Sequence, residues 1–161
     1  MTHQHTLTLS SPAFKHNTSM PVETTCRGRN ISPELHWDGV PAETESFALI
    51  MDDPDIPMPW LQLMTWTHWI IYDIPGDLRG LARHIAGTYT CPTGAQQAIT
   101  SFRKPGYGGP CPPFGTHRYH FRIHALDCTL DLNPAHTHRA DVEHAMAGHL
   151  LDAAVLVGLY R

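Results

Sequence analysis

The stretch GYGGPCPPFG, from Gly106 to Gly115, most constrains what this chain can fold into. Its three prolines, Pro110, Pro112 and Pro113, each fix φ and remove a backbone donor, so the stretch cannot form a regular helix. Its glycines permit backbone angles that other residues avoid. The sequence therefore predicts a stiff, irregular loop at this place.

A strand is expected directly after this loop, because apolar and polar side chains alternate from Tyr119 to Ala125. His117 has the same parity as the apolar residues of this strand. Its imidazole is therefore expected to face inward where the strand begins. A stiff loop that leads into an inward-facing histidine is typical of the wall of a pocket.

The composition favours one compact domain that spans residues 1–161. Apolar residues make up 42% of the chain and charged residues 16%, and 161 residues suffice to bury a core without metals or disulfides. The net charge of −4 and the isoelectric point near 6.3 argue against a nucleic-acid-binding surface, which needs clustered Lys and Arg. No apolar run approaches the ~18 residues that a membrane-spanning helix needs.

The first ten residues, MTHQHTLTLS, lack the basic start and the apolar centre of a secretory signal, which favours a cytoplasmic location. The four cysteines, Cys26, Cys91, Cys111 and Cys128, are widely spaced and include no C-x-x-C pair. In a chain of this size, reduced and mostly structural thiols are the expected state.

The rest of the chain indicates a mainly β fold. ESFALIMDD (45–53) and WTHWIIYDIP (66–75) are nearly continuous apolar runs, typical of central strands covered on both faces. HTLTLSSPAF (5–14) and AAVLVGLY (153–160) indicate a first and a last strand, and prolines and glycines interrupt the chain too often for a helical protein. One helix is expected near the C-terminus, from an apolar stripe that comprises Val142, Ala145, Met146, His149, Leu150 and Ala153.

The segment MDDPDIP (51–57) holds the first candidate for chemistry. Asp53 has the same strand parity as Met51, so its carboxylate is expected to face inward. Burying a carboxylate costs several kcal/mol unless a partner compensates it, and the candidates are His68, His117 and Arg118. Against this interpretation, Asp-Pro-Asp is also an ordinary turn sequence, which is the commoner meaning of so short a motif.

His68 lies in TWTHWII, on the same strand face as Trp66 and Ile70. A lone histidine there is more often a hydrogen-bonded core residue than a functional one. However, Asp53, His68 and His117 are each expected at a strand end beside a Pro-rich loop. We therefore predict that one carboxylate and two imidazoles converge on one small cavity.

Thirteen histidines invite a metal interpretation, but their spacing does not support it. A zincin needs two histidines at i and i+4 on a helix, whereas His120 and His124 lie on a predicted strand and His144 and His149 are five residues apart. No metal and no cofactor are therefore expected. The chain has no G-x-S-x-G nucleophile motif, and Cys111 has no assigned base, so this thiol is expected to be structural.

Six segments in a fixed order resemble the phosphatidylethanolamine-binding protein family, and in particular its bacterial and archaeal branch, often labelled Raf kinase inhibitor-like. They are CRGRNISPELHWDGVP, SFALIMDDPD, HWIIYDIP, GYGGPCPPFGTHRYHF, ALD and AMAGHLLDAAVLVGLY. Two motifs carry the likeness, namely Asp53-Pro54-Asp55-x-Pro57 with a later His68, and Gly115-x-His117-Arg118-Tyr119. Each motif is weak alone, but the ordered set is specific and covers the chain from about Phe14 onward.

The resemblance implies an antiparallel β-sandwich with a large central sheet, peripheral helices that include a C-terminal helix, and a pocket for phosphate, acetate or a phosphorylated head group. By motif match, the residues that bind the anion would be Asp53, Asp55, His68, His117 and Tyr119, with Pro57 and Pro113 as pocket walls. Arg118 would support the site by pairing with an acidic residue, for which Asp53 is the first candidate. A buried Asp53 would orient a histidine and favour its charged form, so that binding weakens as the histidines lose protons near neutral pH.

The segment PMPWLQLMT (57–65) departs from the pattern because it is unusually apolar. It is expected as a loop that either folds back over the core or forms an exposed interface. Tryptophan and methionine are favoured in interface cores, and symmetric dimers are the commonest oligomers. The sequence therefore suggests a homodimer with Trp60 at or near the contact.

These features favour a non-enzymatic protein that binds a small anionic or phosphate-bearing ligand. A regulator that binds another protein, such as a kinase or protease inhibitor, is the second hypothesis, because one pocket could accept a phosphorylated side chain. A hydrolase that uses His68 or His117 as base and Asp53 to orient it is the third. The third lacks a nucleophile or a metal, and a base alone defines no reaction.

Overall fold

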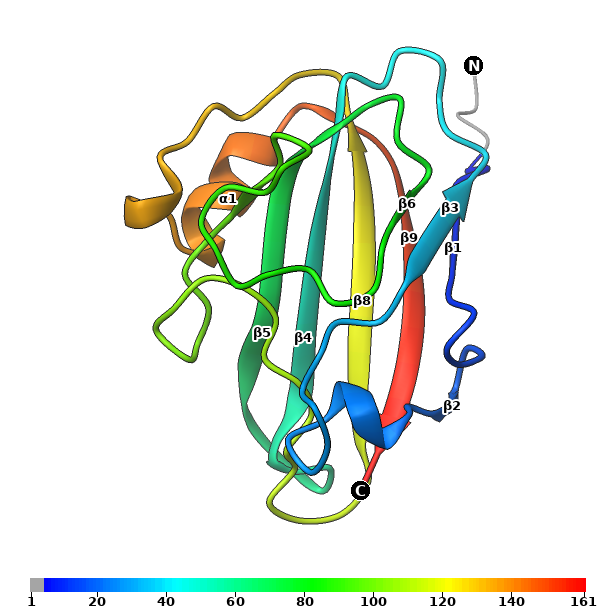
Figure 1. The fold of residues 1–161 in the computed structure, drawn as a ribbon, viewed down its shortest axis with the longest axis vertical. Helices are drawn as coiled ribbons and strands as arrows, with labels where there is room; N and C mark the ends of the chain where they lie inside the picture. The colour runs from blue at the N-terminus through cyan, green and yellow to red at the C-terminus, as the bar shows by residue number, and fades with distance from the viewer. Residues whose placement is uncertain (1–4) are drawn as a thin grey trace.

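The computed structural model describes residues 5–161 and shows a mainly β architecture of two sheets (Figure 1). The larger sheet has the strand order β2-β9-β8-β4-β5-β7 and the smaller one the order β1-β3-β6. All neighbouring strands are antiparallel except β2 and β9, which are parallel. The strands are β1 (Thr8–Ser10), β2 (Thr18–Ser19), β3 (Leu35–Asp38), β4 (Ser46–Met58), β5 (Leu61–Pro75), β6 (Gly80–Leu81), β7 (Gln96–Gln97), β8 (His117–Leu126) and β9 (Leu150–Tyr160).

The central strand β4 is covered on both faces, as its continuous apolar run predicts. Phe47 and Leu49 point into the main core, where they pack with residues of the smaller sheet such as Trp37. Ala48 and Ile50 point to the opposite face and join a second apolar cluster. Because successive strand residues alternate between faces, a strand buried on both sides must be apolar at every position.

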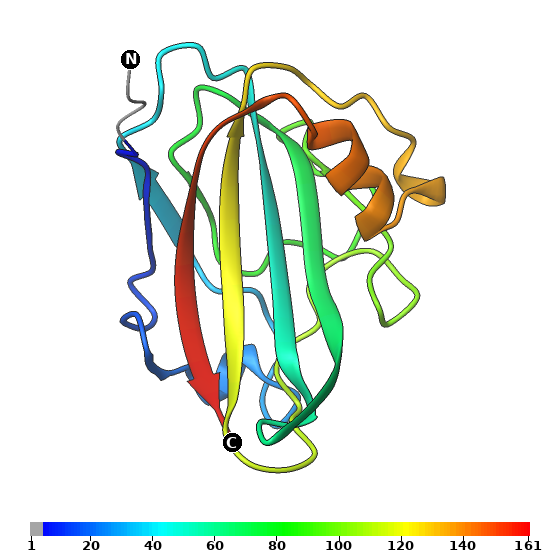
Figure 2. The same ribbon diagram turned by 180° about the vertical axis from the view of Figure 1, so that it is seen from behind.

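The second cluster is covered by the helix α1 (Arg139–Met146), which lies beside the upper end of β5 (Figure 2). Val142 and Met146 are the helix residues buried there. The apolar stripe predicted a helix as far as Ala153, which is wrong beyond Met146. Leu150 already begins β9, because pairing with β8 satisfies the backbone along the whole segment.

No helix within residues 5–161 combines the length and the apolar character needed to cross a membrane. The two other helical segments, η1 (Val22–Thr24) and η2 (Pro134–His136), are single 3-10 turns of three residues each.

The segment expected as a loop between residues 57 and 65 forms a long hairpin instead. Strand β4 extends to Met58 and β5 begins at Leu61, so the turn consists of Pro59 and Trp60 alone. The tip does not fold over the core, since 72% of Trp60 and 71% of Leu63 are exposed.

The loop from Gly106 to Gly115, which we call the pocket loop, closes the same end of the large sheet and leads into β8 (Figure 1). It contains no regular helix or strand, as its prolines predict. Gly106 has a φ of +91°, a conformation that favours glycine. Gly109 packs so closely on the Thr24 carbonyl that an added Cβ would lie only 2.1 Å from its oxygen. The glycines therefore permit the loop to lie directly on the segment around Thr24.

Candidate functional site

A cavity of about 170 Å³ opens where β4, β5 and β8 meet the pocket loop. Three polar side chains reach it, one from each strand: Asp53, His68 and Tyr119. The remaining wall is formed by Ile56, Trp66, Phe102 and Cys111. The site thus combines few polar groups with a largely apolar wall, which is typical of a small-molecule pocket.

A β-bulge turns His68 toward this cavity. In the ladder between β4 and β5, Met51 pairs with Trp69 but Asp52 pairs with Thr67, so His68 is the extra residue. Without the bulge, His68 would share the face of Ile70, which belongs to the cluster under α1. Bulges often re-aim a side chain beside a functional site, and this one brings the imidazole to Tyr119, with 5.3 Å between ring centroids.

His68 lines the cavity as a neutral imidazole. Its Nδ1 lies 2.7 Å from the Gly108 carbonyl oxygen, which can only accept, so Nδ1 carries the proton and Nε2 the lone pair. Burial lowers the pKa of His68 to about 4, although the hydrogen bonds to the pocket loop oppose this effect. At neutral pH the ring therefore offers no positive charge of its own.

Asp53 and His117 form a buried pair, with 2.6 Å between Oδ2 and Nδ1. The other ring nitrogen, Nε2, lies 2.8 Å from the Phe114 carbonyl oxygen. Because both partners of the ring are acceptors, the pair holds two protons and is neutral as a whole. Burial raises the pKa of Asp53, and the hydrogen bond from His117 partly offsets this. The pair thus places no net charge beside the cavity.

The structure pairs Arg118 with an acidic residue, as expected, but the partner is Asp55 and not Asp53. Arg118 donates from Nε and Nη2 to the two Asp55 oxygens at 3.0 and 2.7 Å, and its backbone N–H donates to Oδ2 at 3.0 Å. Gln62 in β5 also donates to this carboxylate. Burial alone would raise the pKa of Asp55, but these hydrogen bonds outweigh it and lower the pKa to about 2. Asp55 therefore joins β4, β5 and β8 and does not line the cavity.

Tyr119 is the most unusual polar group of the site. Its side chain is buried and lines the cavity, and its hydroxyl has no hydrogen-bond partner among residues 5–161. Burial raises the pKa of Tyr119, so the phenol is neutral and can donate. A buried hydroxyl without a partner costs free energy, and Tyr119 is one of the residues that line the cavity.

The structure brings the predicted site residues together only in part. Asp53, His68 and Tyr119 line the cavity, and His117 stands behind Asp53. Pro57 and Pro113 do not line it. Their expected role belongs to Ile56, Trp66, Phe102 and Cys111, which the motifs did not identify. Two of them had a signal in the sequence, because Trp66 had the strand parity of His68 and Cys111 lay in the loop expected as a pocket wall.

The expectation of reduced thiols is wrong for Cys111, which forms a disulfide with Cys26 (S–S 2.09 Å). Both residues are exposed, and 85 positions separate them in the sequence. Cys91 and Cys128 are free. A sulfur held in a disulfide is not a thiolate nucleophile, and no group of three metal-ligand side chains gathers at the cavity within the described chain.

Three comparisons place this fold and sequence among known proteins. A family model described as phosphatidylethanolamine-binding protein matches residues 10–161. The UPF0098 protein of Methanothermobacter thermautotrophicus is 47% identical over 96% of this chain and 99% of its own length. The UPF0098 protein of Aquifex aeolicus is 44% identical over 94% of this chain and 86% of its own.

Solved structures agree with these sequence matches. CT736 of Chlamydia trachomatis, a homolog of phosphatidylethanolamine-binding protein, superposes with a TM-score of 0.87 at 33% identity, covering 98% of this chain and 99% of its own. YbcL of E. coli, described as a member of the mammalian family, superposes with a TM-score of 0.85 at 30% identity, covering 97% and 98%.

Proposed function

Because this chain belongs to the phosphatidylethanolamine-binding protein family, we propose that it is a non-enzymatic protein that binds a small anion or phosphate head group in the cavity between Asp53, His68 and Tyr119. The observation that carries the proposal is the Tyr119 hydroxyl, buried and without a partner beside the cavity. Leaving such a donor unsatisfied costs about 1–3 kcal/mol. A ligand oxygen at this position would remove that cost.

The charge state of the cavity decides which anion it accepts. The Asp53–His117 pair is neutral, so Asp53 does not repel an anion with a full charge. His68 presents a lone pair, so the ligand must bring a proton to Nε2. A monoprotonated phosphate meets both needs, because its P–OH can donate to His68 and its P–O⁻ can accept from Tyr119. His117 and Asp55 then act as supports, and they do not contact the ligand.

A hydrolase stays the weaker hypothesis. His68 is a neutral imidazole that could act as a base, but no side chain of the cavity wall is an activated nucleophile. Activity would therefore require a water molecule that the cavity orients for attack. Release of inorganic phosphate from an aryl phosphate, at a rate that falls on His68→Gln, would establish this hypothesis in place of simple binding.

Titration with inorganic phosphate tests the binding proposal. Isothermal calorimetry and NMR should detect one site per chain, with His68 among the first signals to shift. Tyr119→Phe should weaken binding about tenfold, because one charge-assisted hydrogen bond is lost. Binding of a phosphate monoester should weaken from pH 5 to pH 8, because loss of its last proton (pKa about 6) removes the P–OH, whereas inorganic phosphate keeps one as HPO4²⁻.

Tyr107→Phe is the matched control for this titration. The Tyr107 hydroxyl donates to the Thr24 carbonyl at 2.8 Å and does not line the cavity. Its loss should lower stability by about 1 kcal/mol and leave phosphate affinity unchanged. Phosphate binding that is equal in wild type and Tyr119→Phe would contradict the proposed site.

We also propose that the exposed hairpin tip forms a protein contact, first of all with a second copy of this chain. Its apolar side chains and that of Phe114 form the hairpin patch, which comprises Trp60, Leu61, Leu63, Met64 and Phe114 and has 46–72% exposure at each residue. Pro59 and Trp60 lie against Gly115, so the patch adjoins the pocket loop. Soluble monomers seldom expose such a cluster. A kinase- or protease-type partner would use the same surface under the second hypothesis.

A cytoplasmic location stays a prediction, and the Cys26–Cys111 disulfide argues against it for most organisms. Disulfides persist mainly in oxidising compartments, with the cell interior of hyperthermophiles as an exception. Alkylation of free thiols at the moment of lysis, followed by mass spectrometry of both cysteines, would decide the matter.

A further inference from the structure

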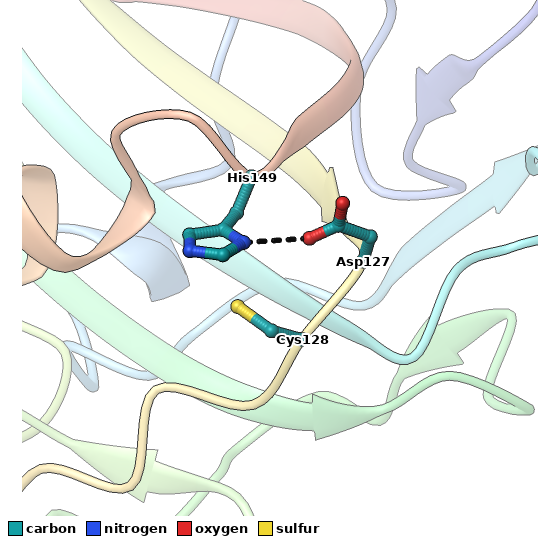
Figure 3. A group of neighbouring side chains, drawn as sticks. All are labelled: Asp127, Cys128 and His149. Atoms are coloured by element: carbon teal, nitrogen blue, oxygen red, sulfur yellow. Dashed lines mark hydrogen bonds and ion pairs between the residues drawn. The ribbon is translucent and has the colours of Figure 1, made fainter.

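A second cluster of reactive side chains lies at the opposite end of β8 from the cavity. Asp127 and Cys128 follow the last residue of β8, and His149 precedes the first residue of β9. Figure 3 shows the three side chains converging, and their ligand-type atoms all lie within 4.8 Å of one another. At ~3.3 Å per strand residue, roughly 30 Å of β8 separates this cluster from the cavity.

The backbone holds the two segments of this cluster together. The Asp127 N–H donates to the His149 carbonyl at 3.1 Å, and the side chains of the same two residues are hydrogen-bonded at 2.8 Å (Figure 3). The hydroxyl of Ser46, the first residue of β4, donates to the Cys128 carbonyl at 2.5 Å. The cluster is therefore anchored to three strands of the large sheet.

The loop after Cys128 is fixed as well. The Asp73 carboxylate accepts the backbone N–H groups of Leu130 and Asp131 at 2.7 and 3.0 Å. These bonds tie the loop to the end of β5. A site formed by such a loop is preorganised, because little chain entropy is lost when a ligand binds.

The surroundings of Cys128 favour a cation. The carboxylates of Asp127, Asp73, Glu45 and Asp131 are the charged groups that act on its sulfur, and a divalent cation would offset their negative charge. Cys128 forms no disulfide, and the described structure has no hydrogen bond between Cys128 and His149. The sulfur is therefore free to coordinate a cation, and coordination deprotonates a thiol outright.

We propose that Asp127, Cys128 and His149 form a binding site for zinc. One oxygen, one sulfur and one nitrogen are the donors that zinc takes in proteins, whereas calcium and magnesium prefer oxygen alone. Three protein ligands leave the fourth tetrahedral position open to water. Tetrahedral ligands about 2.0–2.3 Å from zinc lie roughly 3.3–3.8 Å apart, so the hydrogen bond between Asp127 and His149 at 2.8 Å must open while the Cys128 sulfur stays within reach of both. The half-exposed His149 and Asp127 side chains have room for that rotation.

The spacing of histidine pairs did not predict this site, because its ligands come from two segments. Asp127 and His149 are 22 positions apart and meet only through the pairing of β8 with β9. Each histidine pair in the sequence analysis lay within one segment.

Cobalt and zinc titrations of the full-length chain, with the disulfide intact, test the proposal. One equivalent of Co²⁺ should bind and produce a thiolate-to-cobalt charge-transfer band in the near ultraviolet, which zinc should then displace. Zinc binding should release protons, seen as a dependence of the calorimetric heat on the buffer, because the ligands must lose them. Cys128→Ser should abolish the band, and His149→Gln should weaken zinc binding at least tenfold.

Cys91→Ser serves as the control, because Cys91 is the other free thiol and lies in the main core. This variant should keep the band and the zinc affinity of the wild type. Absence of stoichiometric zinc binding at micromolar concentration would overturn the proposal. Two other outcomes would overturn it equally, because histidines elsewhere would then be the ligands. One is zinc binding by a protein whose cobalt form lacks the thiolate band. The other is zinc binding that both Cys128→Ser and His149→Gln leave intact.

Discussion

At the scale of single residues, each buried charge of the site has a partner on another strand. Asp53 is hydrogen-bonded to His117 and Asp55 to Arg118, so these two carboxylates of β4 are bound to the start of β8. Among the residues of the cavity, the Tyr119 hydroxyl is left without a partner; Thr44 Oγ1, away from the site, is the other such buried atom within residues 5–161. The charged groups of the site thus satisfy one another, whereas this phenol does not.

Arg118→Met should destabilise the protein by roughly 2–4 kcal/mol at pH 7. The Asp55 side chain is 1% exposed, and a buried carboxylate that loses its partner is costly. Its folded pKa of about 2 lies below the ordinary value of 3.8, so the stability it supplies is present above pH 3.8 and is lost as the pH falls toward 2. Urea unfolding should therefore show a large difference from wild type at pH 7 and a small one near pH 3.

Two further variants control the Arg118→Met measurement. Arg122→Met removes a guanidinium that is hydrogen-bonded to His120 and not to a buried carboxylate, and it should cost less than about 1 kcal/mol. Asp55→Asn, added to Arg118→Met, should recover part of the lost stability because no buried charge remains. A loss for Arg118→Met that is independent of pH would show that packing, not charge, is responsible.

His68 should make the folded state less stable in mild acid. Its pKa is about 4 in the folded protein and 6.5 as a model value. The unfolded chain therefore takes up the proton first, and unfolding free energy should fall by about 3 kcal/mol as the pH drops from 6.5 to 4. Comparison of wild type with His68→Gln by urea unfolding isolates this contribution. An NMR titration that places the His68 pKa near 6.5 would refute the expectation.

Strand parity and motif position identified most of the polar residues of the site, but not their pairing. Asp53, His68 and His117 do lie at one end of the large sheet, as predicted. Two bulges determine where these side chains point, because the alternation of side chains between the two faces of a sheet is interrupted wherever one strand carries an extra residue. One re-aims His68, and the other lies between Asp53 and Ile56, where Asp55 pairs with Arg118.

At the scale of elements, the pocket loop is positioned by contacts to one N-terminal segment. Tyr107 donates to the Thr24 carbonyl, Gly109 donates to the Asn30 side chain, and Cys26 donates from its backbone to the Pro110 carbonyl. The Cys26–Cys111 disulfide adds a covalent link at the same place. The cavity wall thus depends on a segment that precedes it by about eighty residues.

Removal of the disulfide should lower stability by about 2–4 kcal/mol, because the unfolded chain loses a long cross-link. The double variant Cys26→Ser/Cys111→Ser tests this by urea unfolding. Its pocket-loop amides should also exchange faster with solvent, while those of β8 stay protected. Cys91→Ser, measured in parallel, controls for the general effect of removing a sulfur from this chain.

Element type was predictable where local pattern and tertiary pairing agree. The central strands and the irregular pocket loop follow directly from apolar runs and prolines. The pattern failed at His149 and Leu150, where helical spacing of apolar residues continues but the backbone enters β9. It also failed at the tip formed by Pro59 and Trp60, because strand pairing extends across prolines that alone indicate a loop.

At the scale of the whole molecule, the hairpin patch predicts a homodimer. Light scattering at micromolar concentration should give twice the chain mass for wild type, and Trp60→Glu should shift it toward the monomer. Leu150→Glu is the matched control, since Leu150 is an exposed apolar residue (53%) outside the patch. A monomeric wild type would contradict the prediction of a homodimer. A dimer that Trp60→Glu leaves intact would show that the interface lies elsewhere.

The link between Cys26 and Cys111 also changes the covalent topology of the chain. It closes a ring that contains the strands β3 to β7, and therefore parts of both sheets, with β8 and β9 as a tail outside it. A protease that cuts once between these cysteines opens the ring but releases no fragment. Such a nicked molecule should migrate as one species on a denaturing gel without reductant and as two with it. The exposed hairpin tip at Trp60 lies inside this ring, so a cut at the proposed interface would leave the protein covalently in one piece.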